Sequence, residues 1–87
     1  MNISFTSSFE KRFKNLDSKI RKITFDKIEI FKSDMFHPSF RMHSLRSSLR
    51  GFWSISINHS HRIIFKRKDN GDIVFYSIGK HDIYGNL

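Results

Sequence analysis

Cysteine is absent from this 87-residue sequence, proline occurs once and glycine four times. Without cysteine the chain can form neither a disulfide framework nor a thiolate zinc site, which is compatible with a reducing cytosol. Its apolar runs cover only a few residues each, and the amino terminus shows no hydrophobic signal stretch. We therefore expect no membrane-spanning segment and no membrane partner.

Acidic residues are also scarce. The chain has 8 Asp and Glu against 16 Lys and Arg, which gives a formal net charge of +8. Such a charge on a small protein favours an anionic partner, for example nucleic acid, an acidic protein or a membrane surface. The alternative is a solvated basic surface that serves solubility alone.

Aromatic residues are abundant, with ten Phe and an aromatic content of 15%. Large rings bury much apolar area per residue, which suits the thin core of a short chain. The length predicts a single domain over residues 1–87.

The first half of the chain predicts a strand followed by helix. Apolar and polar residues alternate over Asn2–Thr6, and Ser7 with Glu10 forms a capping-box pattern. Periodicity alone does not decide between one helix and two, but Asp17 offers a second N-cap. We therefore predict an α-hairpin of helices Ser8–Leu16 and Asp17–Lys32. The second helix should bury an apolar stripe of Ile20, Ile23, Ile28, Phe31 and Met35.

The second half predicts a meander of three antiparallel strands, at Phe52–Ile57, Arg62–Lys66 and Ile73–Ile78. Asn70 and Gly71 predict a type I′ hairpin turn between the last two. The middle strand is apolar on both faces and should be central. The fold class is therefore α+β, with an N-terminal strand and an α-hairpin packed on a twisted, mainly antiparallel sheet that the first strand joins.

Histidines suggest one possible site. His59 and His61 have the i, i+2 spacing that places side chains on one face of a strand, and His81 could complete a three-histidine metal site. No carboxylate or cysteine joins them at a familiar spacing. We therefore predict no metal and no cofactor, and exposed turn histidines are the simpler interpretation.

A second constellation lies around the strand that starts at Arg62. This arginine is either a clamp for an anionic phosphate or an ordinary edge residue. After Gly79, which permits a kink, Lys80, His81 and Tyr84 bring a cation, an imidazole and a phenol close together. They form either part of a site or a frayed C-terminal tail.

This set of residues fits cleavage of RNA phosphodiesters. The 2′-OH of RNA is the nucleophile, so the protein need only orient it, stabilise charge and move protons. The sequence contains no zinc finger, no RNP1 motif and no G-x-x-G loop of a KH domain.

Four segments together resemble the RelE/ParE toxin superfamily, most closely its YafQ-like and RelE/StbE-type members. They are His37–Arg46, Leu49–Ile57, His61–Phe65 and Ile78–Tyr84. The resemblance covers the whole chain and implies a RelE-like fold. It also implies a cytoplasmic, ribosome-dependent endoribonuclease (mRNA interferase) that cuts mRNA in the ribosomal A site. A small acidic antitoxin, encoded next to the toxin, would be the partner, and operator DNA would be bound only through the toxin–antitoxin complex.

The resemblance also implies roles for individual residues. His81 takes the position of a general acid, Tyr84 that of an aromatic orienting the mRNA, and Arg62 that of the arginine holding the scissile phosphate. Lys80 directly precedes the acid, as in some relatives. Arg46 and Arg50 lie where relatives carry basic residues facing rRNA or substrate, and the RNA-binding candidates are completed by Arg41 and His43.

The general base has no counterpart, because the carboxylate that some relatives use is missing. His59 or His61 could substitute for it. Two other functions remain open: a DNA gyrase inhibitor, as in members that lack the C-terminal histidine, and an inactive homologue that only binds its antitoxin. The presence of His81 favours the ribonuclease.

Overall fold

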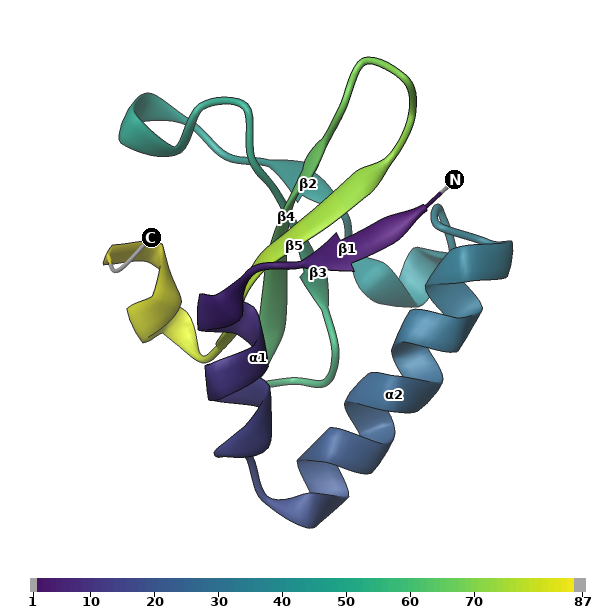
Figure 1. The fold of residues 1–87 in the computed structure, drawn as a ribbon, viewed down its shortest axis with the longest axis vertical. Coiled ribbons are helices and arrows are strands. Elements are labelled where there is room, and N and C mark those ends of the chain that lie inside the picture. The colour runs from purple at the N-terminus through teal and green to yellow at the C-terminus, as the bar shows by residue number, and fades with distance from the viewer. Residues whose placement is uncertain (1, 86–87) are drawn as a thin grey trace.

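The computed structural model describes residues 2–85, and within them two α-helices pack on one five-stranded mixed sheet (Figure 1). The strands are β1 (Ile3–Phe5), β2 (His43–Ser44), β3 (Trp53–Ser56), β4 (Arg62–Arg67) and β5 (Ile73–Gly79). The helices are α1 (Ser7–Lys14) and α2 (Ser18–Ser33), and short 3-10 helices form η1 (Pro38–Phe40), η2 (Ser47–Leu49) and η3 (His81–Gly85). No helix in the described part of the chain is long and apolar enough to cross a membrane.

The strand order is β1-β5-β4-β3-β2, so β4 is central, as predicted. The first strand joins the sheet by pairing parallel to β5, with Ile3 opposite Ile73. All other neighbours are antiparallel. The predicted α+β class and the mainly antiparallel sheet are thus confirmed.

Both helices begin at side-chain caps. Asp17 caps α2 as predicted, because its carboxylate accepts a hydrogen bond of 2.8 Å from the backbone N–H of Lys19. The predicted cap of α1 at Ser7 is wrong by one residue. Thr6 is the cap: its Oγ1 accepts from the N–H of Phe9 at 3.0 Å and donates to the carbonyl of Tyr76 at 2.8 Å. This second bond ties the helix start to β5.

The buried stripe of α2 differs from the predicted one. Ile28 and Phe31 are buried as expected, but Ile23 is 36% exposed and Thr24 takes its place in the core. Thr24 is tolerated there because its hydroxyl donates to the carbonyl of Ile20 at 2.7 Å, which satisfies the buried polar group within the helix.

The turn at Asn70 and Gly71 is not of the predicted type I′. A type I′ turn needs positive φ at both residues, but of the two only Gly71 has it, at 91°. The side chain of Asn70 instead accepts a hydrogen bond of 3.0 Å from the N–H of Asp72, which forms an Asx turn. The loop between Arg67 and Ile73 therefore spans 68–72.

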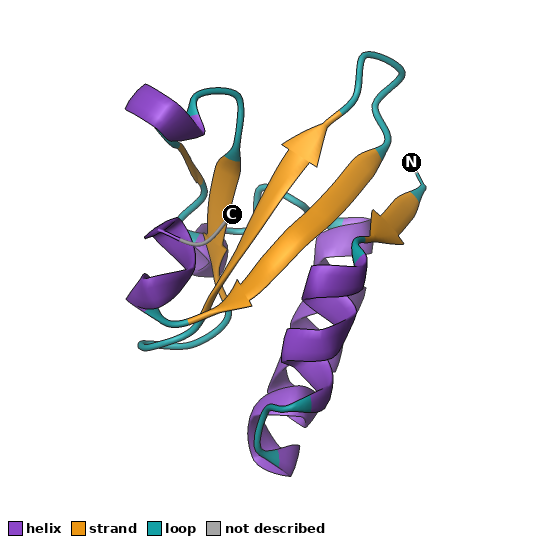
Figure 2. Cartoon of the chain, turned by 60° about the vertical axis from the view of Figure 1, so that its left-hand side comes forward, coloured by secondary structure: helices purple, strands orange, loops and turns teal. Residues whose placement is uncertain are grey.

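The two faces of the sheet differ in their cover. Phe31 of α2 makes edge contacts with the rings of Phe65 on β4 and Phe75 on β5, so the helices cover one face with the main core. By strand alternation Ile64 points to the other face, where short segments, including η3, lie (Figure 2). That second face has no α-helix over it and carries the polar side chains described next.

Candidate functional site

Ser54 lies at the centre of a polar cluster on the face opposite the helices. Its Oγ accepts a hydrogen bond of 2.9 Å from Nε of Arg62 and lies 3.0 Å from the hydroxyl of Tyr84. The side chain is completely buried. Ser54 therefore holds two predicted site residues, from β4 and η3, in a fixed relation to each other.

Sequence reasoning did not single out Ser54. The available signal is the alternation in Trp53–Ser56, which places two serines on the face that Arg62 also occupies. Registers confirm this placement, since Ser54 pairs with Ile64 and Ser56 with Arg62. A small hydroxyl residue leaves room beside it for the arginine head group and supplies an acceptor for its N–H.

His43 on β2 lies next to the guanidinium of Arg62. Its Nδ1 lies 3.4 Å from Nη2 of Arg62 and 3.0 Å from the carbonyl oxygen of Arg41. A guanidinium only donates and a carbonyl only accepts, so one Nδ1 cannot bond to both. The shorter contact favours Nδ1–H donating to Arg41. The neutral imidazole then carries its lone pair on Nε2, the form that a general base requires.

His81 and Tyr84 lie together on η3. Their rings are 5.9 Å apart between centroids, and the imidazole is exposed. The segment fits closely against the end of β5 because Gly79 has no side chain: a Cβ there would come within 2.6 Å of Cγ2 of Ile83. Ile83 itself is fully buried. The tail is therefore packed onto the sheet and presents His81 at its surface.

We call this set the Arg62 cluster; it consists of His43, Ser54, Arg62, His81 and Tyr84. Beside it lies a pocket of about 380 Å³, the basic pocket, lined by Lys27, Ser39, Arg41, Ser56, Ile57, Asn58, His59 and Arg62. Arg62 belongs to both. Two further predicted residues, Arg41 and His59, thus lie in a pocket that adjoins the cluster.

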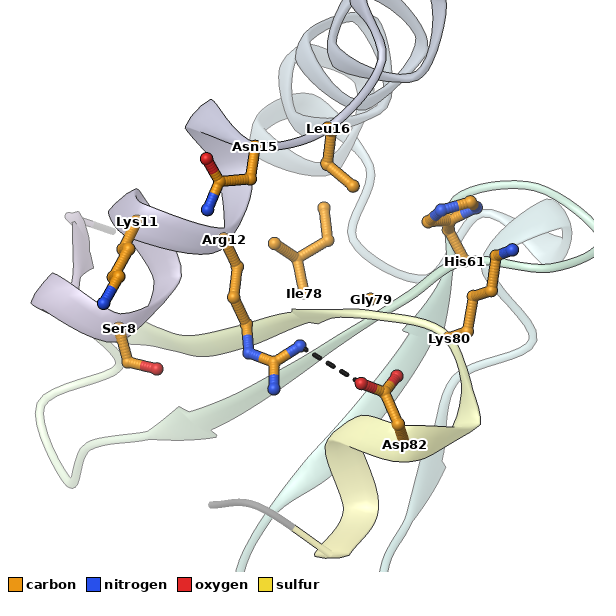
Figure 3. A pocket seen from close by; sticks show the side chains of 10 residues that line it. All are labelled: Ser8, Lys11, Arg12, Asn15, Leu16, His61, Ile78, Gly79, Lys80 and Asp82. Carbon is orange, nitrogen blue, oxygen red and sulfur yellow. Dashed lines mark hydrogen bonds and ion pairs between the residues drawn. The ribbon is translucent and has the colours of Figure 1, made fainter.

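His61 and Lys80 lie elsewhere. They line a pocket of about 600 Å³ beside α1, together with Arg12 and Asp82, whose side chains are joined by an ion pair of 3.5 Å (Figure 3). Burial lowers the pKa of His61 below its ordinary value, and the positive charge of Lys80 lowers it further. The structure thus separates these two residues from the Arg62 cluster.

The expected common face of His59 and His61 is wrong. The segment from Asn58 forms a turn, in which the Asn58 side-chain oxygen accepts from the N–H of Ser60 at 2.9 Å and of His61 at 2.8 Å. Strand alternation does not apply inside a turn, so the two histidines line different pockets. Within residues 2–85 no group of three His, Cys, Asp or Glu side chains is placed to hold a metal ion.

Arg46 and Arg50 flank η2 and are exposed. Within the described range neither forms a hydrogen bond or ion pair with the Arg62 cluster. They lie on the connection between β2 and β3.

The Arg62 cluster combines groups for general acid–base chemistry on a phosphate. The guanidinium can stabilise an anionic phosphoryl group. The imidazole of His43 lies beside it, and that of His81 lies beside Tyr84 at the surface. The phenol of Tyr84 offers a ring for stacking against a base.

No protein-family model matches the sequence, and no curated protein sequence matches it significantly. Solved structures do resemble it. YafQ from E. coli superposes with a TM-score of 0.73 at 18% identity, over 95% of this chain and 96% of that one. The RelBE2 toxin–antitoxin complex of Mycobacterium tuberculosis gives 0.76 at 15% identity, over 92% and 96%.

The YoeB–YefM toxin–antitoxin complex of Staphylococcus aureus has higher identity, 28%, with a TM-score of 0.67 over 93% of this chain and 97% of that chain. The similarity extends along nearly the full length of each protein, including the sheet and both helices. By its fold, this chain is similar to toxins of the RelE/ParE-type superfamily.

Proposed function

We propose that this protein is the toxin of a type II toxin–antitoxin module, and that it cleaves mRNA in the A site of the ribosome. The observation that carries the proposal is the junction at Ser54, which holds Arg62 and Tyr84 together on the open face of the sheet. An arginine held in this way offers a preorganised charge for a phosphodiester, and His43 and His81 supply the groups that move protons.

In the proposed reaction, the 2′-OH of the RNA attacks the adjacent phosphorus. His43 takes the proton of the 2′-OH through Nε2, because Nδ1–H donates to the carbonyl of Arg41. Arg62 stabilises the additional negative charge on the phosphoryl oxygens. The bond from phosphorus to the 5′-oxygen breaks, and His81 protonates that oxygen. The products are a 2′,3′-cyclic phosphate and a 5′-hydroxyl end.

The other predicted catalytic residues have different roles in this proposal. Tyr84 orients the substrate by stacking, with its hydroxyl held by Ser54. His59 lines the basic pocket beside Arg62 and takes part in substrate binding. His61 and Lys80 lie beside α1, so we assign them no step in the chemistry. His43 replaces both histidines as the proposed base.

The positive charge fits the partners of such a toxin. A net charge of +8 suits the phosphates of mRNA and rRNA in the cytoplasm, with Arg46 and Arg50 as contacts at the periphery of the site. It also suits a small acidic antitoxin encoded by a neighbouring gene, which would fold on binding. Operator DNA would be bound only through the resulting complex. S. aureus YoeB and M. tuberculosis RelE are both known in complexes with their antitoxins.

The direct test is cleavage of an mRNA on programmed ribosomes, mapped by primer extension. Wild-type protein should cut at codon positions in the A site, and only when the mRNA is bound to the ribosome. Arg62→Ala and His81→Ala should each lower the rate by roughly 10²-fold or more, because a charge stabiliser or a proton donor is removed. A single 2′-deoxy nucleotide at the cut site should abolish cleavage.

Two outcomes would contradict the proposal. Inhibition of gyrase supercoiling without any mRNA cleavage would identify a gyrase inhibitor. Binding to the antitoxin without toxicity or cleavage would identify an inactive homologue. Full cleavage by Arg62→Ala would leave the reaction in place and overturn the assignment of the site.

A further inference from the structure

Among the described residues that line the basic pocket there are three cations and no carboxylate. Lys27, Arg41 and Arg62 all line it, and its other lining residues are neutral side chains and His59. Its volume of about 380 Å³ lies within the usual range for small-ligand sites, about 300–1,000 Å³. Positive side chains that converge without a counter-ion repel each other, so an anionic ligand in the pocket would relieve that repulsion.

Lys27 differs from the neighbouring lysines of α2. Lys22 pairs with Asp26 at 2.8 Å and Lys32 with Glu29 at 2.9 Å, both along the helix. Lys27 is half-buried, and in the described range no carboxylate oxygen lies within 4.0 Å of its Nζ. Its charge is therefore not neutralised along the helix.

The position of Lys27 is nevertheless well defined. Its Nζ donates to Oγ of Ser39 at 3.2 Å and lies 5.8 Å from the centre of the Phe40 ring. These two contacts hold the ammonium group at the wall of the pocket. Both leave donor capacity free, because an ammonium has three N–H groups and one is used by Ser39.

Arg41 enters the same pocket from an unusual backbone conformation. Its φ of 46° and ψ of 45° are left-handed, which for a residue other than glycine costs on the order of 1 kcal/mol. The N–H of Arg41 bonds to the carbonyl of Pro38 at 3.1 Å, which closes η1 and helps maintain this geometry. This left-handed residue ends η1, and its side chain lines the basic pocket.

We propose that the basic pocket binds a second phosphodiester of single-stranded RNA, next to the one held by Arg62, with Lys27 as a phosphate-binding residue. Arg62 lines both the pocket and the Arg62 cluster, so a strand that leaves the scissile phosphate can enter the pocket without interruption. Ser39, Ser56 and Asn58 add hydroxyl and amide groups that can bond to the ribose or to a base. This inference rests on the proposed function.

Salt dependence of binding gives a sharp test. The probe is a short single-stranded RNA with every 2′-oxygen methylated, which the protein cannot cleave. Its affinity is measured by fluorescence anisotropy over a series of NaCl concentrations. For single strands, each neutralised phosphate contributes a slope of about −0.7 in log K against log [salt].

We expect Lys27→Ala to reduce the magnitude of the slope by about 0.7 and to weaken binding at low salt by roughly 3- to 10-fold. Lys27→Arg should restore both. Lys19→Ala is the matched control, because Lys19 is an exposed lysine of the same helix outside the basic pocket, and it should bind as the wild type does. Thermal melts of all variants check that the fold is retained.

An unchanged slope in Lys27→Ala would overturn the inference, as would a wild-type protein that does not bind the probe. Weaker binding of an acidic peptide by Lys27→Ala, with RNA binding unchanged, would assign the pocket to a protein partner instead.

Cleavage of mRNA on ribosomes distinguishes failure of this inference from failure of the proposed nuclease function. If Arg62→Ala abolishes cleavage while Lys27→Ala retains the wild-type slope, only this inference fails. If the slope changes but wild-type protein never cleaves, the pocket binds RNA and the nuclease function fails.

Discussion

The hydroxyl of Tyr84 lies 3.0 Å from Oγ of the buried Ser54, thirty residues earlier in the chain. This contact connects η3, near the end of the described chain, to β3. The same Oγ accepts a hydrogen bond from Nε of Arg62. One small side chain therefore determines how the arginine and the phenol are placed relative to each other.

Replacing Ser54 by Ala should lower the rate of mRNA cleavage by roughly 10- to 100-fold, because Arg62 and Tyr84 lose their common partner and the geometry at the phosphate relaxes. Single-turnover cleavage on programmed ribosomes measures this. The matched control is Ser77→Ala, which removes a buried serine hydroxyl that has no hydrogen-bond partner among the described residues. Equal rates for the two variants would contradict the positioning role of Ser54.

His43→Gln should lower the cleavage rate by roughly 10²-fold near neutral pH, because glutamine preserves a polar group beside Arg62 but cannot accept a proton as a base. Single-turnover cleavage on programmed ribosomes measures the change. A rate close to that of the wild type would assign the base to another residue.

Gly79→Ala should destabilise the protein by about 1–3 kcal/mol, because the added Cβ would come within 2.6 Å of Cγ2 of the buried Ile83 and 3.2 Å of Nη1 of Arg12. Urea unfolding followed by circular dichroism measures the change. Gly85→Ala is the control, since a Cβ there meets nothing within 4 Å. A displaced η3 should also reduce cleavage, so an alanine variant with unaltered stability and activity would contradict the close packing.

His61 should make the stability of the fold depend on pH. Burial lowers its pKa in the folded state below the ordinary value of 6.5, with further lowering by Lys80 and His59. Below pH 6.5 the unfolded chain therefore binds a proton that the folded chain excludes, so stability decreases as pH falls and the decrease ends once pH is below the folded pKa. Above 6.5 the contribution is fully retained.

Melting temperatures of the wild type and His61→Gln, measured from about pH 8 to about pH 5, test this linkage. The variant should lose less stability over that interval. Parallel curves for the two proteins would show that His61 keeps an ordinary pKa in the fold. Cleavage by His61→Gln, measured at pH values where both proteins are folded, should stay close to that of the wild type, because His61 lies beside α1 and away from Arg62.

Ser77→Ala should leave the free energy of unfolding unchanged or raise it by up to about 1 kcal/mol. The hydroxyl of Ser77 is buried without a partner in the described part of the chain, and removing such a group relieves its desolvation cost. Urea unfolding measures the change. A clear destabilisation would show that the hydroxyl has a partner, for example a bound water molecule.

Local chemistry accounts for the parts of the fold that the sequence predicted well. Asp17 is a polar cap with an amphipathic run after it, and the helix begins there. The apolar run at Ile64 predicts a central strand, and β4 is central. The predicted helix cap and the predicted turn differ from the observed ones. Thr6 replaces Ser7 as a cap and also bonds to β5, and the side chain of Asn70 accepts from the N–H of Asp72 in an Asx turn.

For the candidate site, the sequence singled out Arg62, His81 and Tyr84 by residue type and by resemblance, and the structure brings them together with His43. It could not separate these residues from His61 and Lys80, which directly precede Arg62 and His81 in the chain. Successive side chains of a strand point to opposite faces, and a turn redirects them again, so adjacency in sequence says little about a shared site.

The sequence by itself determined the α+β class, the order of the elements, the strongly positive charge and the kinds of side chain available for chemistry. These follow from periodicity and composition, which act within a few residues. Only the tertiary structure decided that Ser54 joins Arg62 to Tyr84, that His43 approaches the same guanidinium, and that Lys27 from a helix lines a pocket with Arg41 from a loop. Those relations depend on strand register and on how the chain returns to the sheet, because the atoms concerned lie far apart in the sequence and meet only when the core forms.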